Sequence, residues 1–353
     1  MAVGLACSAV AQHLGVRPKL ETEGSFSMIV LPDPQNYMKF ECNQPIFELM
    51  TTWIANNRKS LNIKTALCTG DLVDRNNTIV GKRGNGDQTS TQMWQASARA
   101  FGHLDGVLPY VVCCGNHDYG FDKTSENRNS QFSRYFTSDK NPCWHDALVS
   151  VCNNAANEPT LENAAFEIET GSPAWGKLLV VTLEFTPRDT VLRWAKQLVS
   201  KKKYAHTKVI VLTHSYINEH GQPIAHEKYP ICQEPDANSG QGIWDKLINE
   251  CPNISMVVCG HICSIAPYEQ NVAFSTQVNK AGRRVAQMMF NAQTADGYWS
   301  GNGGDGWLRI LEFKPDGKTV SVHTFSPLLA VSALSADKAW RTASYDQFTF
   351  ELE

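Results

Sequence analysis

Five short polar motifs along the chain contain side chains that bind metal ions and move protons. In chain order they are DPQ at 33–35, GDLVD at 70–74, GNHD at 115–118, THS at 213–215 and GHIC at 260–263. Carboxylate, amide and imidazole groups together form a mixed oxygen and nitrogen environment, which suits Mn, Fe or Zn better than Ca or Mg alone. A carboxylate with ligands on both sides is the two-metal arrangement for displacement at phosphorus. The motifs therefore predict a metal site able to act on a phosphorus ester.

Each motif directly follows a short apolar run. The runs are nearly continuous in Val, Ile and Leu, as expected of strands buried on both faces. Amphipathic segments typical of helices lie between several of them, and this alternation predicts a layered α/β domain. Ligands in α/β sheets bind outside the carboxyl ends of strands, so we expect the five motifs to meet at one rim. The runs, including one that ends without a motif, are FSMIVLPD, TALCTGD, PYVVCCGNHD, KLLVVTLEF, KVIVLTHS and ISMVVCGH.

In this order, the motifs resemble the five blocks of the calcineurin-like metallophosphoesterase superfamily. The usual forms of those blocks are D-x-H, G-D-x-x-D, G-N-H-D/E, a lone His and G-H-x-H. The resemblance covers roughly residues 26–265. It implies an α/β fold, the four-layer α/β/β/α sandwich with mixed sheets. It also implies a hydrolase in which a metal-bound hydroxide attacks a phosphomonoester or phosphodiester in line with the leaving oxygen.

The resemblance also implies which residues bind metal. Asp71 is expected to bridge two ions and Asp33 to bind the first. The second ion is expected to be held by Asn116, His214 and His261.

Four further residues receive roles from the same resemblance. His117 is expected beside the leaving group as general acid or phosphate stabiliser, with Asp118 placed to orient it. Asp74 is expected next to the metal ligands rather than among them, a frequent position for carboxylates in such sites. Arg75 stands where one branch of the superfamily has an arginine that contacts phosphate.

Two positions depart from the usual blocks, and both would serve the first metal. Gln35 and Cys263 stand where histidines are usual. Gln35 could offer a weak neutral carbonyl ligand, while Cys263 could be a thiolate ligand, an unligated thiol or a disulfide partner. We therefore expect two divalent or trivalent ions (Zn, Fe or Mn), with a single tightly bound ion as the alternative. A non-catalytic or weakly active protein that binds metal or an anion, and a hydrolase of phosphonate or sulfate esters, are the competing functions.

The composition limits the classes of binding partner and substrate that the sequence predicts. A net charge of −3 gives no electrostatic reason to expect nucleic acid or anionic membrane. No run approaches the roughly 20 apolar residues of a membrane span. A small-molecule or exposed phosphoester is the expected substrate, and neither its identity nor the oligomeric state follows from the sequence.

The chain length favours one elaborated domain over residues 25–353. Irregular inserted loops are expected at about 75–92 and 119–165, where polar and Gly- or Asn-rich stretches fit no core element. From residue 284 onward, consecutive strands separated by turns predict an antiparallel sheet.

The N-terminal segment, residues 1–24, resembles the end of a signal peptide, since Ala9 and Ala11 precede Gln12. This predicts export to a periplasm or the medium, with a cytoplasmic location as the alternative. The spacing of the cysteines allows disulfides in an exported protein. The pairs considered are Cys143 with Cys152 and Cys232 with Cys251.

Overall fold

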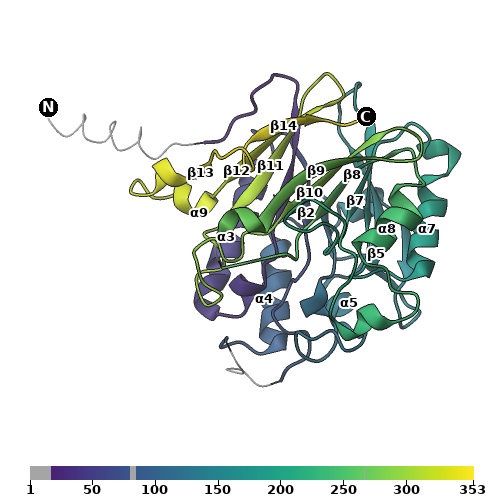
Figure 1. Ribbon diagram of the computed structural model, residues 1–353. Helices are drawn as coiled ribbons and strands as arrows, with labels where there is room; N and C mark the ends of the chain where they lie inside the picture. The colour runs from purple at the N-terminus through teal and green to yellow at the C-terminus, as the bar shows by residue number, and fades with distance from the viewer. Residues whose placement is uncertain (1–16, 80–84, 266) are drawn as a thin grey trace, which may run out of the picture.

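A computed structural model describes residues 17–79, 85–265 and 267–353 of the chain. Within these residues the strands form two mixed sheets of seven strands each (Figure 1). The expected export signal at residues 9–12 lies outside the described part. None of the described helices combines the length and apolar character needed to cross a bilayer.

The first sheet contains the strands that lead into the first three motifs. β1, β2 and β3 are parallel, and β11 pairs antiparallel with β1, so that the order is β13-β12-β11-β1-β2-β3, with β14 also on β12. Their bounds are β1 Phe26–Leu31, β2 Ile63–Cys68, β3 Tyr110–Val112, β11 Leu308–Phe313, β12 Thr319–Phe325, β13 Trp340–Arg341 and β14 Phe348–Glu351.

The second sheet contains the strands that lead into the last two motifs. Its order is β4-β5-β6-β7-β8-β10-β9, in which β6, β7, β8 and β10 are parallel and both edges are antiparallel. The bounds are β4 Leu148–Asn153, β5 Pro159–Glu169, β6 Lys177–Thr182, β7 Val209–Leu212, β8 Ile254–Cys259, β9 Val272–Val278 and β10 Arg284–Phe290.

Helices cover the outer face of each sheet, which makes the four layers (Figure 1). α3 and α4 pack on the first sheet, and α7 with the α8–η5 segment packs on the second. Alternate residues of the second sheet divide between two cores: Ile210 faces the first sheet, whereas Val211 faces the helices. The four-layer α/β/β/α fold expected from the resemblance is therefore confirmed. The longer helices are α3 Gln44–Asn57, α4 Ser90–Gly102, α7 Asp189–Val199, and α8 Gly240–Ile243 continued by the π-helical η5 Trp244–Ile248.

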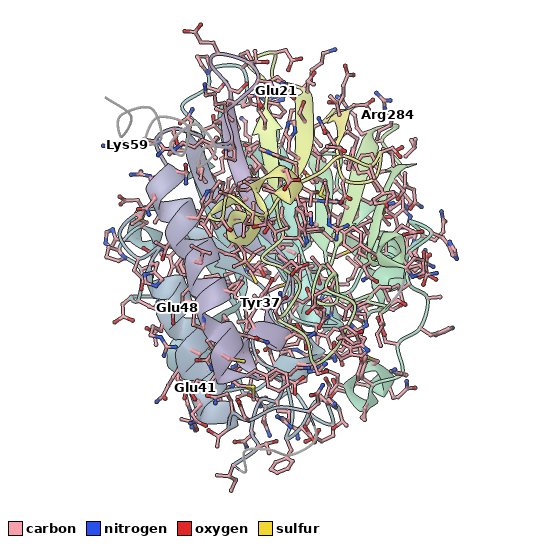
Figure 2. The ribbon with its side chains drawn as sticks, turned by 90° about the vertical axis from the view of Figure 1, so that its left-hand side faces the viewer. Glu21, Tyr37, Glu41, Glu48, Lys59 and Arg284 are labelled. Carbon is pink, nitrogen blue, oxygen red and sulfur yellow. The ribbon has the colours of Figure 1, made fainter. Side chains whose placement is uncertain are left out.

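Local sequence explains where α4 begins. Thr89 accepts a hydrogen bond from the backbone of Gln92, whose side chain bonds back, and this capping box starts α4. Charged residues lie on the outside of the helical layer, where Glu48 of α3 pairs with Arg99 of α4 at 2.6 Å (Figure 2). Short helical turns complete the chain: α2 Gln35–Met38, η1 Glu41–Asn43, η2 Asn116–Asp118, α5 Phe132–Tyr135, α6 Trp144–Ala147, η3 Lys202–Tyr204, η4 Pro230–Gln233, η6 Tyr268–Asn271, α9 Pro327–Ala330 and η7 Ala336–Lys338.

Two expectations about the fold were wrong, and the disulfides that the cysteine spacing allowed do not form. The chain is not irregular throughout 119–165, because β4 and the first half of β5 form the edge of the second sheet. The strands after residue 284 do not form one antiparallel sheet, because β10 joins the second sheet and β11 to β14 join the first. The cysteines considered for disulfides are all free: Cys143, Cys152, Cys232 and Cys251.

Candidate metal centre

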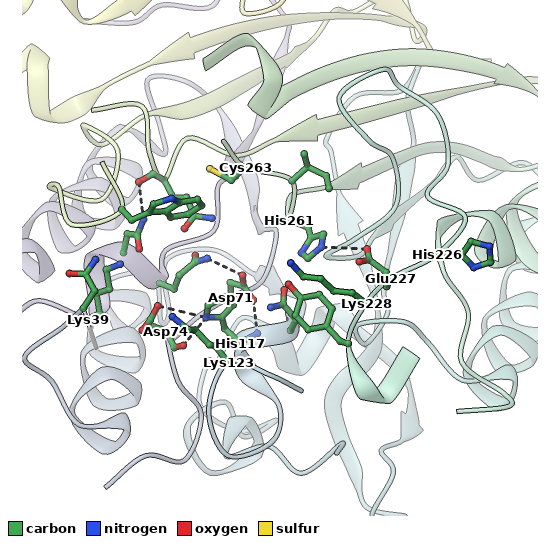
Figure 3. A pocket seen from close by; sticks show the side chains of 18 residues that line it. Lys39, Asp71, Asp74, His117, Lys123, His226, Glu227, Lys228, His261 and Cys263 are labelled. Carbon is green, nitrogen blue, oxygen red and sulfur yellow. Dashed lines mark hydrogen bonds and ion pairs between the residues drawn. The ribbon is translucent and has the colours of Figure 1, made fainter. Parts of the chain in front are cut away.

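The five motifs meet in one pocket of about 730 Å³, at the carboxyl ends of strands from both sheets (Figure 3). β1, β2 and β3 deliver the first three motifs, and β7 and β8 deliver the last two. The pocket is lined by residues of four of the motifs, among them Gln35, Asp71, Asn116, His117 and Cys263. His214 lies behind this lining and is fully buried. The rim expected from the sequence therefore exists, but two facing sheets share it.

Glycines in the motifs let the carboxylates approach the neighbouring strands. A Cβ on Gly115 would lie 2.1 Å from Oδ1 of Asp71, and a Cβ on Gly260 would lie 2.1 Å from Oδ1 of Asp33. No larger residue fits at either position. Asp71 and His261 also adopt the left-handed backbone region, with φ of 52° and 69°. Such conformations cost free energy and occur where surrounding structure holds a functional side chain in place.

Three ligand-type atoms converge on Nε2 of His214, which makes a group of four. Oδ1 of Asn116 and Nδ1 of His261 each lie 3.1 Å from it, and Oδ2 of Asp71 lies 3.4 Å away. Ligand atoms of Asp33, Asp71 and His214 also fall within 4.8 Å of one another. The residues expected at the second metal are therefore together, and the buried group Asp33, Asp71 and His214 could hold a metal ion.

The outer nitrogens of both imidazoles are already engaged. Nδ1 of His214 lies 2.7 Å from the carbonyl oxygen of Thr69, and Nε2 of His261 lies 3.4 Å from Oε1 of Glu227. With a proton on each of these outer nitrogens, both inner nitrogens present lone pairs to each other and to the Asn116 and Asp71 oxygens. Four lone pairs converging on one point require a positive charge between them, so the donor set fits a cation such as Zn, Fe or Mn.

The charges around this point agree with that fit. Burial alone would lower the pKa of His214, but Asp71 and Asp33 outweigh it and raise the pKa to about 10. Burial raises the pKa of Asp33 to about 6, while the histidines outweigh burial at Asp71 and hold its pKa below the usual range. The position therefore keeps a positive charge, either as a proton on His214 or as a metal ion that replaces it.

The position expected for the first metal is arranged differently. Asp33 accepts hydrogen bonds at both oxygens, from the Thr69 hydroxyl at 2.6 Å and from the Asn291 amide at 2.7 Å. The Gln35 amide donates to Oδ2 of Asp71 at 2.9 Å, and its own carbonyl oxygen is buried without a hydrogen-bond partner. An N–H group therefore faces the oxygen that would bridge to a first metal, and in this arrangement the residues do not fit a second cation.

Cys263 lies in the same part of the pocket but is held as a thiol. Its Sγ lies 3.1 Å from the Thr294 hydroxyl, and burial raises the pKa of the thiol to about 12. To bind a metal ion as a thiolate, Cys263 would have to give up this proton and its contact with Thr294.

The expected orientation of His117 by Asp118 was wrong. Asp118 is fully buried, and its carboxylate accepts the backbone N–H groups of Gly115 and Val73. Nδ1 of His117 instead faces Asp74, 2.7 Å from its carbonyl oxygen and 3.7 Å from its carboxylate. The backbone of the second motif places Asp74 next to His117. The Asp118 carboxylate instead bonds to the backbone of Gly115 within its own turn.

Three residues of the centre carried no signal in the motifs. Glu227 contacts His261 from a loop, Asn291 contacts Asp33 from the position directly after β10, and Thr69 lies one position before the second motif. Tertiary packing decides which residue contacts a buried histidine. The sequence could therefore suggest Glu227 only through its residue type, because carboxylates often contact histidines that bind metal.

The chain is similar to known proteins in sequence and in fold. The chain is 26% identical over 303 residues to the uncharacterized protein YvnB of Bacillus subtilis (strain 168). The match covers 86% of this chain and 20% of that protein, so the chain spans about a fifth of the relative's length.

Two solved structures resemble the fold. One is GAP50, described as the anchor in the inner membrane complex of Plasmodium, with a TM-score of 0.46, 13% identity, and coverage of 93% of this chain and 89% of that chain. The other is a dimetal phosphatase from Danio rerio, with a TM-score of 0.48, 8% identity, and coverage of 93% and 99%.

The sequence also matches the calcineurin-like phosphoesterase family over residues 29–264, a span that contains all five motifs. The family expected from those motifs is thereby confirmed, and the chain belongs to the calcineurin-like phosphoesterase family.

Proposed function

We propose that this protein is a metal-dependent hydrolase of phosphoesters. The observation that carries the proposal is the convergence of Asp71, Asn116, His214 and His261 on one point at the wall of an open pocket. A cation bound there would draw negative charge from the phosphoryl oxygens and activate a water molecule. The four residues would hold it, with the inner nitrogens of both histidines directed at it.

His117 is placed to handle the proton of the leaving group. Its Nδ1–H donates to the carbonyl oxygen of Asp74, so the other ring nitrogen, Nε2, is the one left to face the pocket. The Asp74 carboxylate lies 3.7 Å from the same Nδ1 and would balance the charge of the ring whenever Nε2 carries the proton for the leaving group. A phosphoester bound against the metal point would therefore meet a proton donor on the side of its departing oxygen.

A single firmly bound metal ion is the form that the residues favour. The Gln35 amide donates a hydrogen bond to the Asp71 oxygen that would bridge two ions, and the Cys263 sulfur forms a hydrogen bond with the Thr294 hydroxyl. The alternative of a protein that binds metal or an anion without turnover rests on the same two residues. The intact GNHD motif, with His117 supported by Asp74, favours the hydrolase.

Metal content and turnover measured on the same preparation test the proposal. We expect about one equivalent of Zn, Fe or Mn per chain by mass spectrometry after purification without chelators. We also expect metal-dependent hydrolysis of phenyl phosphate or bis(4-nitrophenyl) phosphate. Two tight equivalents would show that Gln35 or Cys263 rearranges to bind the first ion. Bound metal without turnover of either ester class would replace the hydrolase with the binding protein.

A further inference from the structure

The pocket wall beside His117 carries positive charge that the metal chemistry does not use. Lys39, at the C-terminal end of α2, and Lys123, in the loop after the third motif, both line the pocket (Figure 3). Arg75 directly follows Asp74 and is buried behind this lining, where its guanidinium and the backbone of Lys39 both lie beside Gly86. We call Lys39, Arg75 and Lys123 the cationic wall.

Lys39 is buried without a neutralising partner. Only 3% of the residue is exposed, and within the described residues no carboxylate forms an ion pair with Lys39 or Lys123. Burial lowers the pKa of Lys39, and although Asp74 opposes this, Lys123 and Arg75 add repulsion. A desolvated ammonium beside two like charges is unfavourable unless an anion joins it.

Arg75 also has donors to spare. Its Nε and Nη2 atoms are buried without a hydrogen-bond partner, and the nearest carboxylate oxygen, on Asp74, is 3.5 Å from Nε. Asp74 is shared with His117, as described above. The other carboxylate that acts on Lys39, Asp296, accepts a backbone N–H of its own loop from Asn302 at 2.5 Å. The three cations therefore have two carboxylates near them, of which Asp74 already pairs with Arg75 and is shared with His117.

We propose that the cationic wall is a second anion subsite, and that the substrate carries a second phosphate group on its leaving-group side. The proposal rests on the proposed function, because His117 defines that side. The Asp74 carboxylate lies 3.5 Å from Arg75 and 3.7 Å from His117, so the subsite begins next to the departing oxygen. An organic diphosphate or a bisphosphate with neighbouring phosphates fits this placement, and a plain monoester leaves the wall unpaired.

A ratio of substrates tests the subsite. ADP and AMP share base and sugar, but only ADP has a leaving group with its own phosphate. We expect Lys39→Met and Lys123→Met each to lower the ratio of kcat/KM for ADP over AMP by about tenfold, the effect of losing one charge-assisted contact. Comparing the ratio between proteins cancels the intrinsic reactivity of the two bonds. Lys202→Met, at an exposed lysine outside the pocket, should leave the ratio unchanged.

Lys228→Met provides a matched control inside the pocket, because Lys228 lines the wall formed by Glu227 and Tyr229. An equal fall in the ratio for Lys228→Met would assign the effect to general positive potential and overturn the subsite. An unchanged ratio in both Lys39→Met and Lys123→Met would overturn it as well. Lys123 is exposed, so its variant decides the matter even where Lys39→Met fails to fold.

Binding separates this proposal from the proposed function. Imidodiphosphate, whose P–N–P bridge resists hydrolysis, and inorganic phosphate are titrated calorimetrically into the protein as purified. We expect the preference for imidodiphosphate to fall about tenfold in Lys39→Met and Lys123→Met. This result together with no turnover of any ester would retain the subsite and reject the hydrolase. Turnover with no change in the preference would retain the hydrolase and reject the subsite.

Discussion

His117 is the residue on which the proposed proton transfer depends, and its contacts separate it from the metal ligands. Its ring bonds to Asp74, while its backbone N–H donates to Oδ1 of Asp71 at 2.9 Å. His117→Ala removes the ring and keeps that backbone contact. We expect kcat/KM for an aryl phosphate to fall about a hundredfold or more while metal content per chain stays the same.

The exposed His145, outside the centre, gives the control variant His145→Ala, for which both quantities should be unchanged. A proportional loss of metal in His117→Ala would show that His117 is itself a ligand.

Glu227 affects the centre through His261 rather than by touching the metal point. Its carboxylate lies 3.4 Å from Nε2 of His261 and also accepts the Ser215 hydroxyl. Glu227→Gln keeps the shape but weakens the acceptor that fixes the histidine. We expect the dissociation constant of the metal to rise about tenfold or more, measured by competition with a chelator of known affinity. Glu219→Gln, earlier in the same segment, is the control, and equal affinity in both variants would remove Glu227 from the centre.

Among the elements, the segment between β3 and β4 contributes part of the pocket lining, and contacts of Arg128 hold it in place. The buried guanidinium reaches Glu234 at 2.6 Å, the carbonyl oxygens of Phe185 and Thr186, and Glu184 at 3.5 Å. The aromatic residues of this segment are buried or half-buried, apart from Phe121, which is 45% exposed. The segment is therefore a well-packed part of the pocket wall.

Arg128→Met should destabilise the protein, because it removes one partner of the buried Glu184. The expected loss is about 3 kcal/mol in the free energy of unfolding, measured by urea denaturation. Arg134→Met, at an exposed arginine of the same segment, should change it by less than about 0.5 kcal/mol. A loss as small for Arg128 as for Arg134 would mean that Arg188, which pairs with Glu184 at 2.7 Å, suffices to hold that carboxylate.

The strands that lead to the motifs were predictable because each is a continuous apolar run buried on both faces. Their division between two sheets was not, since parallel strands of either sheet have the same pattern. β4 and β5 were not predicted because they lack a continuous apolar run. β4 is only half-buried, contains polar as well as apolar residues, and is followed by an Asn-rich stretch. Motif order predicted which residues gather at the centre, whereas Glu227, Asn291 and the role of Asp74 depend on contacts that no local pattern contains.

For the whole molecule, metal binding and folding should be linked. Four donors from both sheets meet at one point, so a bound ion stabilises only the folded chain. Adding Zn or Mn to stripped protein at a hundred times its dissociation constant should add about 2.7 kcal/mol to the free energy of unfolding. Thermal melts with and without metal measure this, and equal melting temperatures would mean that the centre does not bind the ion.

The same comparison should depend on pH. The pKa of His214 is raised to about 10 in the folded, stripped protein. Its stabilising proton is therefore fully present below the unfolded pKa of about 6.5 and is lost as pH rises toward 10. A metal ion that has replaced this proton is not lost in that range. The gap between the melting temperatures of loaded and stripped protein should therefore widen from pH 7 to pH 9, and a constant gap would argue against His214 as a ligand.

The first strand of the fold is completed by the last third of the chain. β1 pairs with β11, in the register of Phe26 with Phe313, and Asp33 accepts a hydrogen bond from Asn291, 258 positions later. A nascent chain leaving the ribosome therefore carries β1 with one edge unpaired until β11 has been made. Until then the Asp33 carboxylate also lacks its contact with Asn291. Translation that stops before β11 would yield an aggregation-prone fragment in which β1 and Asp33 lack these partners.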